Sequence, residues 1–141
     1  MVGGQAADIA AETAAVPFDL DEITRMQAGK TGALLTWSCR AGAVMAGADA
    51  QPLQAYGDAV GLAFQIADDV LDVTGDATAV GKAVGKDEAA GKATFVSILG
   101  LDGAKSRANE LVEAACDALS VYGDDADTLK QAAMFVVERT H

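Results

Sequence analysis

Hydrophobic positions recur at helical spacing along most of the chain. Between residues 21 and 47, apolar side chains return about every three or four positions, which predicts one long amphipathic helix. A second long helix is predicted over residues 53–73, where apolar residues cover most of the surface, so we expect it at the centre of a bundle. Shorter helices are expected over residues 1–12, 94–100, 102–122 and 125–139. No strand pattern interrupts them, and we predict an all-α fold.

The expected helix boundaries coincide with residues that favour a start or a break. Pro17 lies in a predicted loop, and Asp19 or Asp21 is expected to cap the helix that follows it. Gly29 and Gly32 fall inside that helix and predict a weak point or a kink, because glycine is a poor helix former.

Composition and charge narrow the range of partners. Abundant Ala and Gly with few aromatic residues favour close-packed helices over a β-sandwich. The net charge is −11, from 10 basic and 21 acidic residues. We expect neither nucleic acid nor membrane partners, because phosphate backbones and anionic lipids are bound through Lys and Arg. With no recognisable secretory signal or membrane-spanning apolar stretch, we predict a cytoplasmic protein.

An acidic cluster interrupts the apolar surface of the helix expected over residues 53–73. Gln65, Asp68, Asp69 and Asp72 are spaced so that the three carboxylates are predicted to project to nearly one side of the helix. Two carboxylates this close repel by roughly 3 kcal/mol at an effective dielectric of about 20, and a hard cation relieves that repulsion. Mg²⁺ suits this set, because it typically accepts one or two protein carboxylates.

Two alternatives to a metal site have to be weighed. A solvated acidic face is the usual role of a charge cluster, but the otherwise apolar helix disfavours it, since polar groups on a buried helix need partners. An EF-hand is excluded, because its loop requires oxygen ligands at alternate positions and a glycine at the sixth.

Two basic segments containing glycine are candidate partners for a metal-bound anion. Residues 74–93 have no hydrophobic period, and a loop this long inside a compact domain is usually functional. The loop contains three lysines, Lys82, Lys86 and Lys92. Lys30-Thr31-Gly32 provides a cation and a hydroxyl donor, and Lys30 is a candidate diphosphate ligand. Taken alone, each lysine is as typical of an exposed side chain, and exposure is preferred for Lys86.

Together these segments resemble the trans-polyprenyl diphosphate synthases, the family of farnesyl and geranylgeranyl diphosphate synthases. The stretch from Phe64 to Asp72 resembles the second aspartate-rich motif of that family. Gly81-Lys82 and Gly91-Lys92 resemble the loop that follows it, and Lys30-Thr31 resembles the family's diphosphate-binding pair. Met1 to Gln5 resembles its Gly-Gly-Gln helix. Order and spacing agree over essentially the whole chain.

The resemblance implies a fold, a reaction and a set of site residues. The fold would be the carboxyl-terminal half of the isoprenoid synthase helical bundle, with residues 1–141 as a single partial domain. The reaction would join an allylic diphosphate to isopentenyl diphosphate, in a homodimer or together with the missing amino-terminal half. The Mg²⁺ ligands would be Asp68, Asp69 and Asp72. The catalytic residues would be Lys30, Thr31 and Lys82. The substrates would be bound by Lys30, Thr31, Gln65, Lys82 and, for the second substrate, Arg139.

The sequence also departs from the family pattern. The first aspartate-rich motif and the upstream basic residues that bind isopentenyl diphosphate are not in it. We therefore expect one side of an active site, exposed apolar faces where the other half would pack, and little synthase activity from this chain alone. Two alternatives stay open: a non-catalytic split or regulatory subunit, and a class I terpene cyclase. The product chain length stays undefined, because its determinants precede the first motif.

Overall fold

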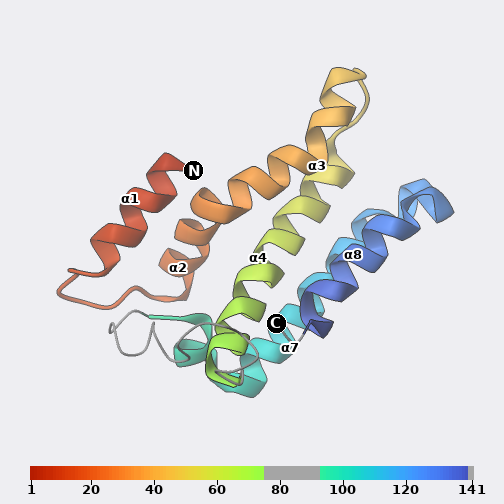
Figure 1. Ribbon diagram of the computed structural model, residues 1–141. Helices are drawn as coiled ribbons and strands as arrows, with labels where there is room; N and C mark the ends of the chain where they lie inside the picture. The colour runs from red at the N-terminus through yellow and green to blue at the C-terminus, as the bar shows by residue number, and fades with distance from the viewer. Residues whose placement is uncertain (75–92, 140–141) are drawn as a thin grey trace.

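The computed structural model describes residues 1–74 and 93–139, and every regular element in these ranges is a helix, as predicted. The elements are α1 (Val2–Ala11), α2 (Leu20–Gln27), the π-helix η1 (Ala28–Gly32), α3 (Ala33–Met45), α4 (Gln51–Thr74), α7 (Phe95–Ala118), the 3₁₀ helix η2 (Ser120–Ala126) and α8 (Asp127–Glu138). Figure 1 shows α4 between α3 on one side and α7 and α8 on the other. The predicted central helix is confirmed by this arrangement. None of the described helices has the length and apolar character needed to cross a membrane.

The long helix predicted over residues 21–47 is three helical segments in direct succession. Asp19 caps the first of them, because its Oδ1 accepts from the Glu22 amide at 2.8 Å while Glu22 Oε2 accepts from the Asp19 amide at 2.9 Å. The weak point predicted at Gly29 and Gly32 takes the form of a π-helical turn rather than a break. Turns of this type are often found at functional sites.

The core lies between α4 and α7. Ala63 and Ile66 on α4 are fully buried, and Phe95 at the start of α7 is 1% exposed. Three alanines on α7 are buried with them: Ala104, Ala108 and Ala115. Small side chains along this contact allow the two helices to approach closely.

Gly100 divides α7 into a short first part and a longer second part. Its φ of 72° and ψ of 164° belong to a backbone region that is open essentially to glycine alone. The predicted boundary between helices over residues 94–100 and 102–122 is confirmed at this glycine. The second helix ends at Ala118 rather than at residue 122, because the chain passes into η2, where Gly123 has a φ of 58°.

Tyr56 fastens α4 to α8. Its hydroxyl donates a hydrogen bond to the carbonyl oxygen of Leu129 at 2.8 Å. Burial, with smaller contributions from Cys39 and Cys116, raises the pKa of Tyr56 to about 12, so the phenol stays protonated and remains a donor. This bond helps to fix α8, whose last turn lies next to the acidic part of α4.

Candidate active site

One face of α4 carries the acidic cluster, and another helical segment crosses α4 on the same face. Gly61, Gln65, Asp68 and Asp72 follow at intervals of four, three and four residues, so a helix of about 100° per residue aligns them in one narrow stripe. We call these four residues the α4 stripe. The π-helix η1 crosses α4 at Gly61, the first residue of the stripe. A Cβ built on Gly61 would lie 3.2 Å from Gly32 Cα. The crossing brings Gly32, the residue that follows the Lys30-Thr31 pair, to the start of the stripe.

Lys30 is held by a buried carboxylate. Its Nζ lies 2.7 Å from Asp8 Oδ2, and Gln5 Nε2 donates to the same oxygen at 3.4 Å. Asp8 is 8% exposed, whereas a third of the Lys30 side chain reaches solvent. Lys30 is therefore a positioned cation and not a free helix lysine, while Thr31 beside it is half-buried. Sequence reasoning missed Asp8, although an aspartate three residues after Gln5 on a short apolar helix was a usable signal.

Gly4 holds α1 against the π-helical turn. A Cβ on Gly4 would lie 2.2 Å from the Lys30 amide nitrogen and 2.3 Å from the Gly29 carbonyl carbon. Backbone atoms cannot yield as a flexible side chain can, so this position requires glycine. The turn that carries Lys30 thus packs through close backbone contacts against α1 on one side and α4 on the other.

The three aspartates occupy different environments, and the structure does not bring them together as predicted. Asp69 Oδ2 accepts a hydrogen bond from the Phe95 amide at 2.7 Å, at the start of α7. Asp68 is about half exposed and Asp72 is half-buried. In the described part of the chain, no three His, Cys, Asp or Glu side chains gather closely enough to hold a metal ion. The reason is geometric: consecutive residues diverge by about 100° around a helix, so Asp69 leaves the stripe that Asp68 and Asp72 share.

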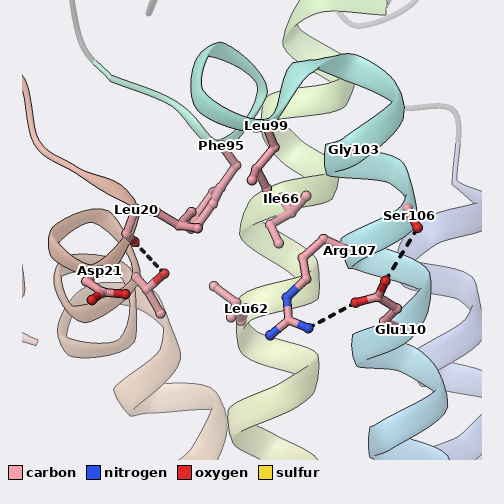
Figure 2. A pocket seen from close by; sticks show the side chains of 11 residues that line it. Leu20, Asp21, Leu62, Ile66, Phe95, Leu99, Gly103, Ser106, Arg107 and Glu110 are labelled. Carbon is pink, nitrogen blue, oxygen red and sulfur yellow. Dashed lines mark hydrogen bonds and ion pairs between the residues drawn. The ribbon is translucent and has the colours of Figure 1, made fainter.

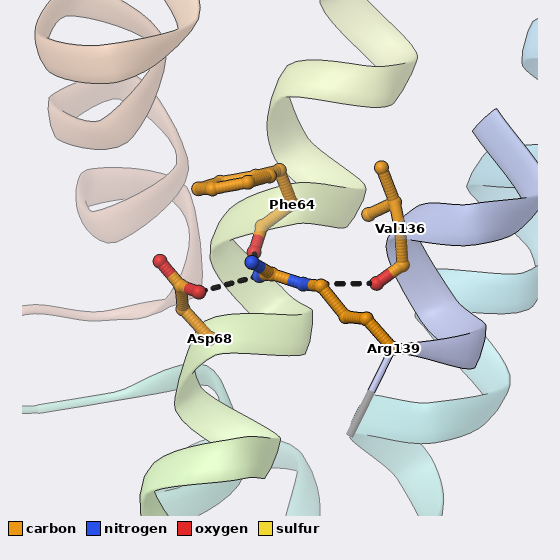
Figure 3. A network of polar contacts seen from close by, with 4 residues as sticks. All are labelled: Phe64, Asp68, Val136 and Arg139. Carbon is orange, nitrogen blue, oxygen red and sulfur yellow. Dashed lines mark hydrogen bonds and ion pairs between the residues drawn. The ribbon is translucent and has the colours of Figure 1, made fainter. Parts of the chain in front are cut away.

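Arg139 reaches from the end of α8 to Asp68, as Figure 3 shows. Its Nη2 lies 2.5 Å from Asp68 Oδ1 and 3.4 Å from the carbonyl oxygen of Phe64. The guanidinium carbon lies 4.2 Å from the centroid of the Phe64 ring, within reach of a cation–π interaction. The role of Arg139 toward a second substrate stays a prediction, and the contact that the structure adds is the one with Asp68.

The donor set of the stripe fits half of a magnesium site. Asp68 and Asp72 are one helical turn apart and offer the carboxylate oxygens that Mg²⁺ prefers. Asp69, engaged with the start of α7, is better placed to orient this part of the helix than to bind an ion directly. The metal-ligand roles of all three residues stay predictions. Lys82, and the basic loop that contains it, lie outside the described residues.

A separate cavity of about 470 Å³ lies between α2 and α7 (Figure 2). Leu62, Ile66 and Phe95 form its apolar wall, and none of the predicted site residues lines it. The basic side chain in this wall, Arg107, is paired with Glu110 at 3.0 Å. The cavity is therefore separate from the residues for which the sequence predicts chemistry.

Known proteins with similar sequences show the family to which the chain belongs. The chain is 38% identical to the farnesyl diphosphate synthase of Escherichia coli strain K12 over 146 residues, which cover 99% of this chain and 48% of the enzyme. The chain therefore spans about half the length of the curated relatives it matches.

Solved structures of the same class share the fold. An FPP/GFPP synthase from Zymomonas mobilis has a TM-score of 0.82 and 48% identity over 97% of this chain and 45% of that one. A geranyltransferase from Helicobacter pylori, solved with magnesium and isoprenyl diphosphate, has a TM-score of 0.76 and 31% identity over 98% of this chain and 46% of that one. The model of the family described as polyprenyl synthetase matches residues 1–133. The chain belongs to the polyprenyl synthetase family.

Proposed function

We propose that this chain supplies the carboxyl-terminal side of the active site of a prenyltransferase, which condenses an allylic diphosphate with isopentenyl diphosphate. The observation that carries the proposal is the contact of Gly32 with Gly61, because it packs the turn that contains Lys30 and Thr31 against the face of α4 that bears Asp68. A cation and carboxylates carried by helices that pack together suit a ligand that is itself a metal-bound anion.

In this proposal each residue of the site has a separate task. Asp68 and Asp72 hold Mg²⁺, while Asp69 fixes α4 to α7 and keeps the two ligands oriented. When bound, Mg²⁺ neutralises charge on the diphosphate and so makes it a better leaving group. Lys30 binds a diphosphate oxygen as a point charge, and Thr31 and Gln65 donate hydrogen bonds to it.

The proposed reaction proceeds in two stages. The allylic carbon–oxygen bond breaks, and the electron pair leaves with the diphosphate, whose charge Lys30 helps to hold. The double bond of isopentenyl diphosphate then attacks the allylic cation, and a proton is lost from the adduct. Lys82 is proposed to act on the allylic diphosphate from the loop after α4. We further propose that the working enzyme is a cytoplasmic homodimer, or an assembly of this chain with the amino-terminal half of the family fold.

The proposal is tested by supplying the amino-terminal half of the family fold. The chain is co-produced with the amino-terminal half of the Escherichia coli relative, and transfer of radiolabelled isopentenyl diphosphate is measured with dimethylallyl diphosphate and Mg²⁺. We expect little product from the chain alone and clear product from the pair, which we call the complemented enzyme. Asp68→Ala should lower its activity by about a hundredfold or more. Asp102→Ala, at an exposed position on α7, is the matched control and should have no effect.

Each alternative function predicts a different outcome. A split or regulatory subunit would form the pair but yield no product, and this result would overturn the proposal. A terpene cyclase would consume the allylic diphosphate without isopentenyl diphosphate. The relatives favour the transferase, since those reported above are prenyl diphosphate synthases or transferases by name.

A further inference from the structure

Arg139 is fixed in place before any ligand is bound. It is the first residue after α8, and its extended backbone turns the side chain back toward α4. Besides the contacts with Asp68 and Phe64, its Nε donates to the Val136 carbonyl oxygen at 3.3 Å. Only 14% of the side chain is exposed. A guanidinium with this many fixed contacts is a preorganised partner for the carboxylate and not a surface ion pair formed by chance.

The contact uses one oxygen, Oδ1, of the carboxylate that the proposed function assigns to Mg²⁺. A metal–oxygen bond of about 2.1 Å at Asp68 would place two further positive charges next to the guanidinium. The repulsion between them grows where water is partly excluded, as it is beneath Phe64. The two cations therefore favour alternative states of Asp68.

The geometry points to Arg139 as an internal counter-ion that competes with the divalent cation for Asp68, so that cation binding releases the end of α8 from α4. This inference rests on the proposed function, because it takes Asp68 as a metal ligand. It adds that the coupling is reciprocal: whatever draws Arg139 away from Asp68 strengthens cation binding by the same factor. Before the cation arrives, the pair also spares Asp68 and Asp72 an unbalanced repulsion on one face of α4.

Trypsin provides a direct readout of the released state. The protease cleaves after Arg139 only when that side chain leaves Asp68 and enters the protease pocket, so the cleavage rate follows the open population. Loss of the last two residues from the complete chain is followed by mass spectrometry, with and without Mg²⁺. We expect Mg²⁺ to accelerate this cleavage about fivefold, and NaCl at equal ionic strength to do less. Asp68→Asn should be cleaved at the fast rate in both conditions.

Calorimetry with Mg²⁺ alone tests the reciprocal effect. Arg139→Gln should bind Mg²⁺ about fivefold more tightly than the unaltered chain, because the competitor is gone. Arg139→Lys should lie between them, since lysine keeps the charge but loses the planar contacts. Arg107→Gln is the matched control, because it removes an arginine that is paired with Glu110 in the wall of the separate cavity, and it should leave the affinity unchanged.

The outcomes separate this inference from the proposed function. A cleavage rate after Arg139 that does not respond to Mg²⁺, or an Arg139→Gln affinity equal to or weaker than that of the unaltered chain, overturns the counter-ion role. If the complemented enzyme makes product in that case, the proposed function stands without it. If Asp68→Ala leaves that activity intact, the proposed function fails, whatever Arg139 does.

Discussion

At the scale of single residues, the acidic motif divides its work between two helix faces. Asp68 and Asp72 share the face that we propose for the metal, whereas Asp69 accepts a hydrogen bond from the backbone at the start of α7. That bond satisfies one of the amide groups that a helix start leaves without an intrahelical partner. Adjacent aspartates in one motif thus differ in role: Asp69 packs α4 against α7, whereas ligand binding by Asp68 is our proposal.

This division predicts effects of different size on stability for two substitutions. Asp69→Ala should lower the free energy of unfolding by about 1–2 kcal/mol, because the Phe95 amide loses its acceptor. Asp72→Ala should change it by less than about 0.5 kcal/mol, since among the described residues Asp72 makes no hydrogen bond or ion pair. Urea denaturation measures both. An Asp72 variant as destabilised as the Asp69 variant would contradict the division.

Features of the site could be predicted from the sequence where they depend on residues that are close together in the chain. The spacing of Gln65, Asp68 and Asp72 on one helix follows from helical geometry, and the sequence was sufficient for it. The partners of Lys30 and Asp68 were not predictable in the same way, because Asp8 and Arg139 lie 22 and 71 residues away along the chain. Such pairs depend on how helices dock, which the period of apolar residues does not encode.

At the scale of elements, glycines determine how closely the helices of the site approach. Gly4 meets the π-helical turn, Gly61 meets Gly32, and a Cβ on Gly57 would lie 2.7 Å from Thr36 Cα. The sequence predicted a weak point near Gly32. It predicted neither the π-helical form nor the contacts, because a glycine shows that a side chain is absent but not which neighbour packs against it. The contacts explain why the weak point is retained in a helix that would be stronger with alanine.

Two adjacent glycines on α1 offer a matched test of this role. Gly4→Ala would force a methyl group into the backbone of the π-helical turn and should cost about 1–3 kcal/mol of folding free energy. Gly3→Ala faces open space and should instead stabilise the chain by about 0.5–1 kcal/mol, because alanine is the better helix former. Thermal unfolding of both variants, followed by circular dichroism, gives the comparison. Equal effects would show that α1 is not packed as described.

At the scale of the whole molecule, the apolar surface is distributed unevenly. On α3, Leu34 and Trp37 lie one turn apart and are 49% and 64% exposed, and Met45 at its end is 88% exposed. On α1, Val2 and Ile9 are exposed as well. Apolar side chains that gather on a surface usually mark a contact with another part of the protein or another chain. We expect the amino-terminal half of the family fold to cover it.

Trp37, the one tryptophan of the sequence, reports on this contact. Its fluorescence should resemble that of a hydrated indole in the chain alone and should shift to shorter wavelengths when the amino-terminal half is added. Leu34→Ser should weaken the association that produces the shift. Val121→Ser, at a position 70% exposed on η2, should not. A shift that follows the concentration of this chain alone would instead assign the face to self-association.

The close approach between α3 and α4 has a consequence for how the site forms. Each glycine inside a helix costs about 0.5–1 kcal/mol relative to alanine, so Gly57 and Gly61 make α4 a poor autonomous helix. The contacts that require those glycines compensate only after α3 has docked. Coil-to-helix conversion and docking should therefore be one cooperative event, and an excised peptide copy of α4 should be largely unstructured. The α4 stripe therefore forms only when α3 and α4 pack together, and α4 alone does not provide it.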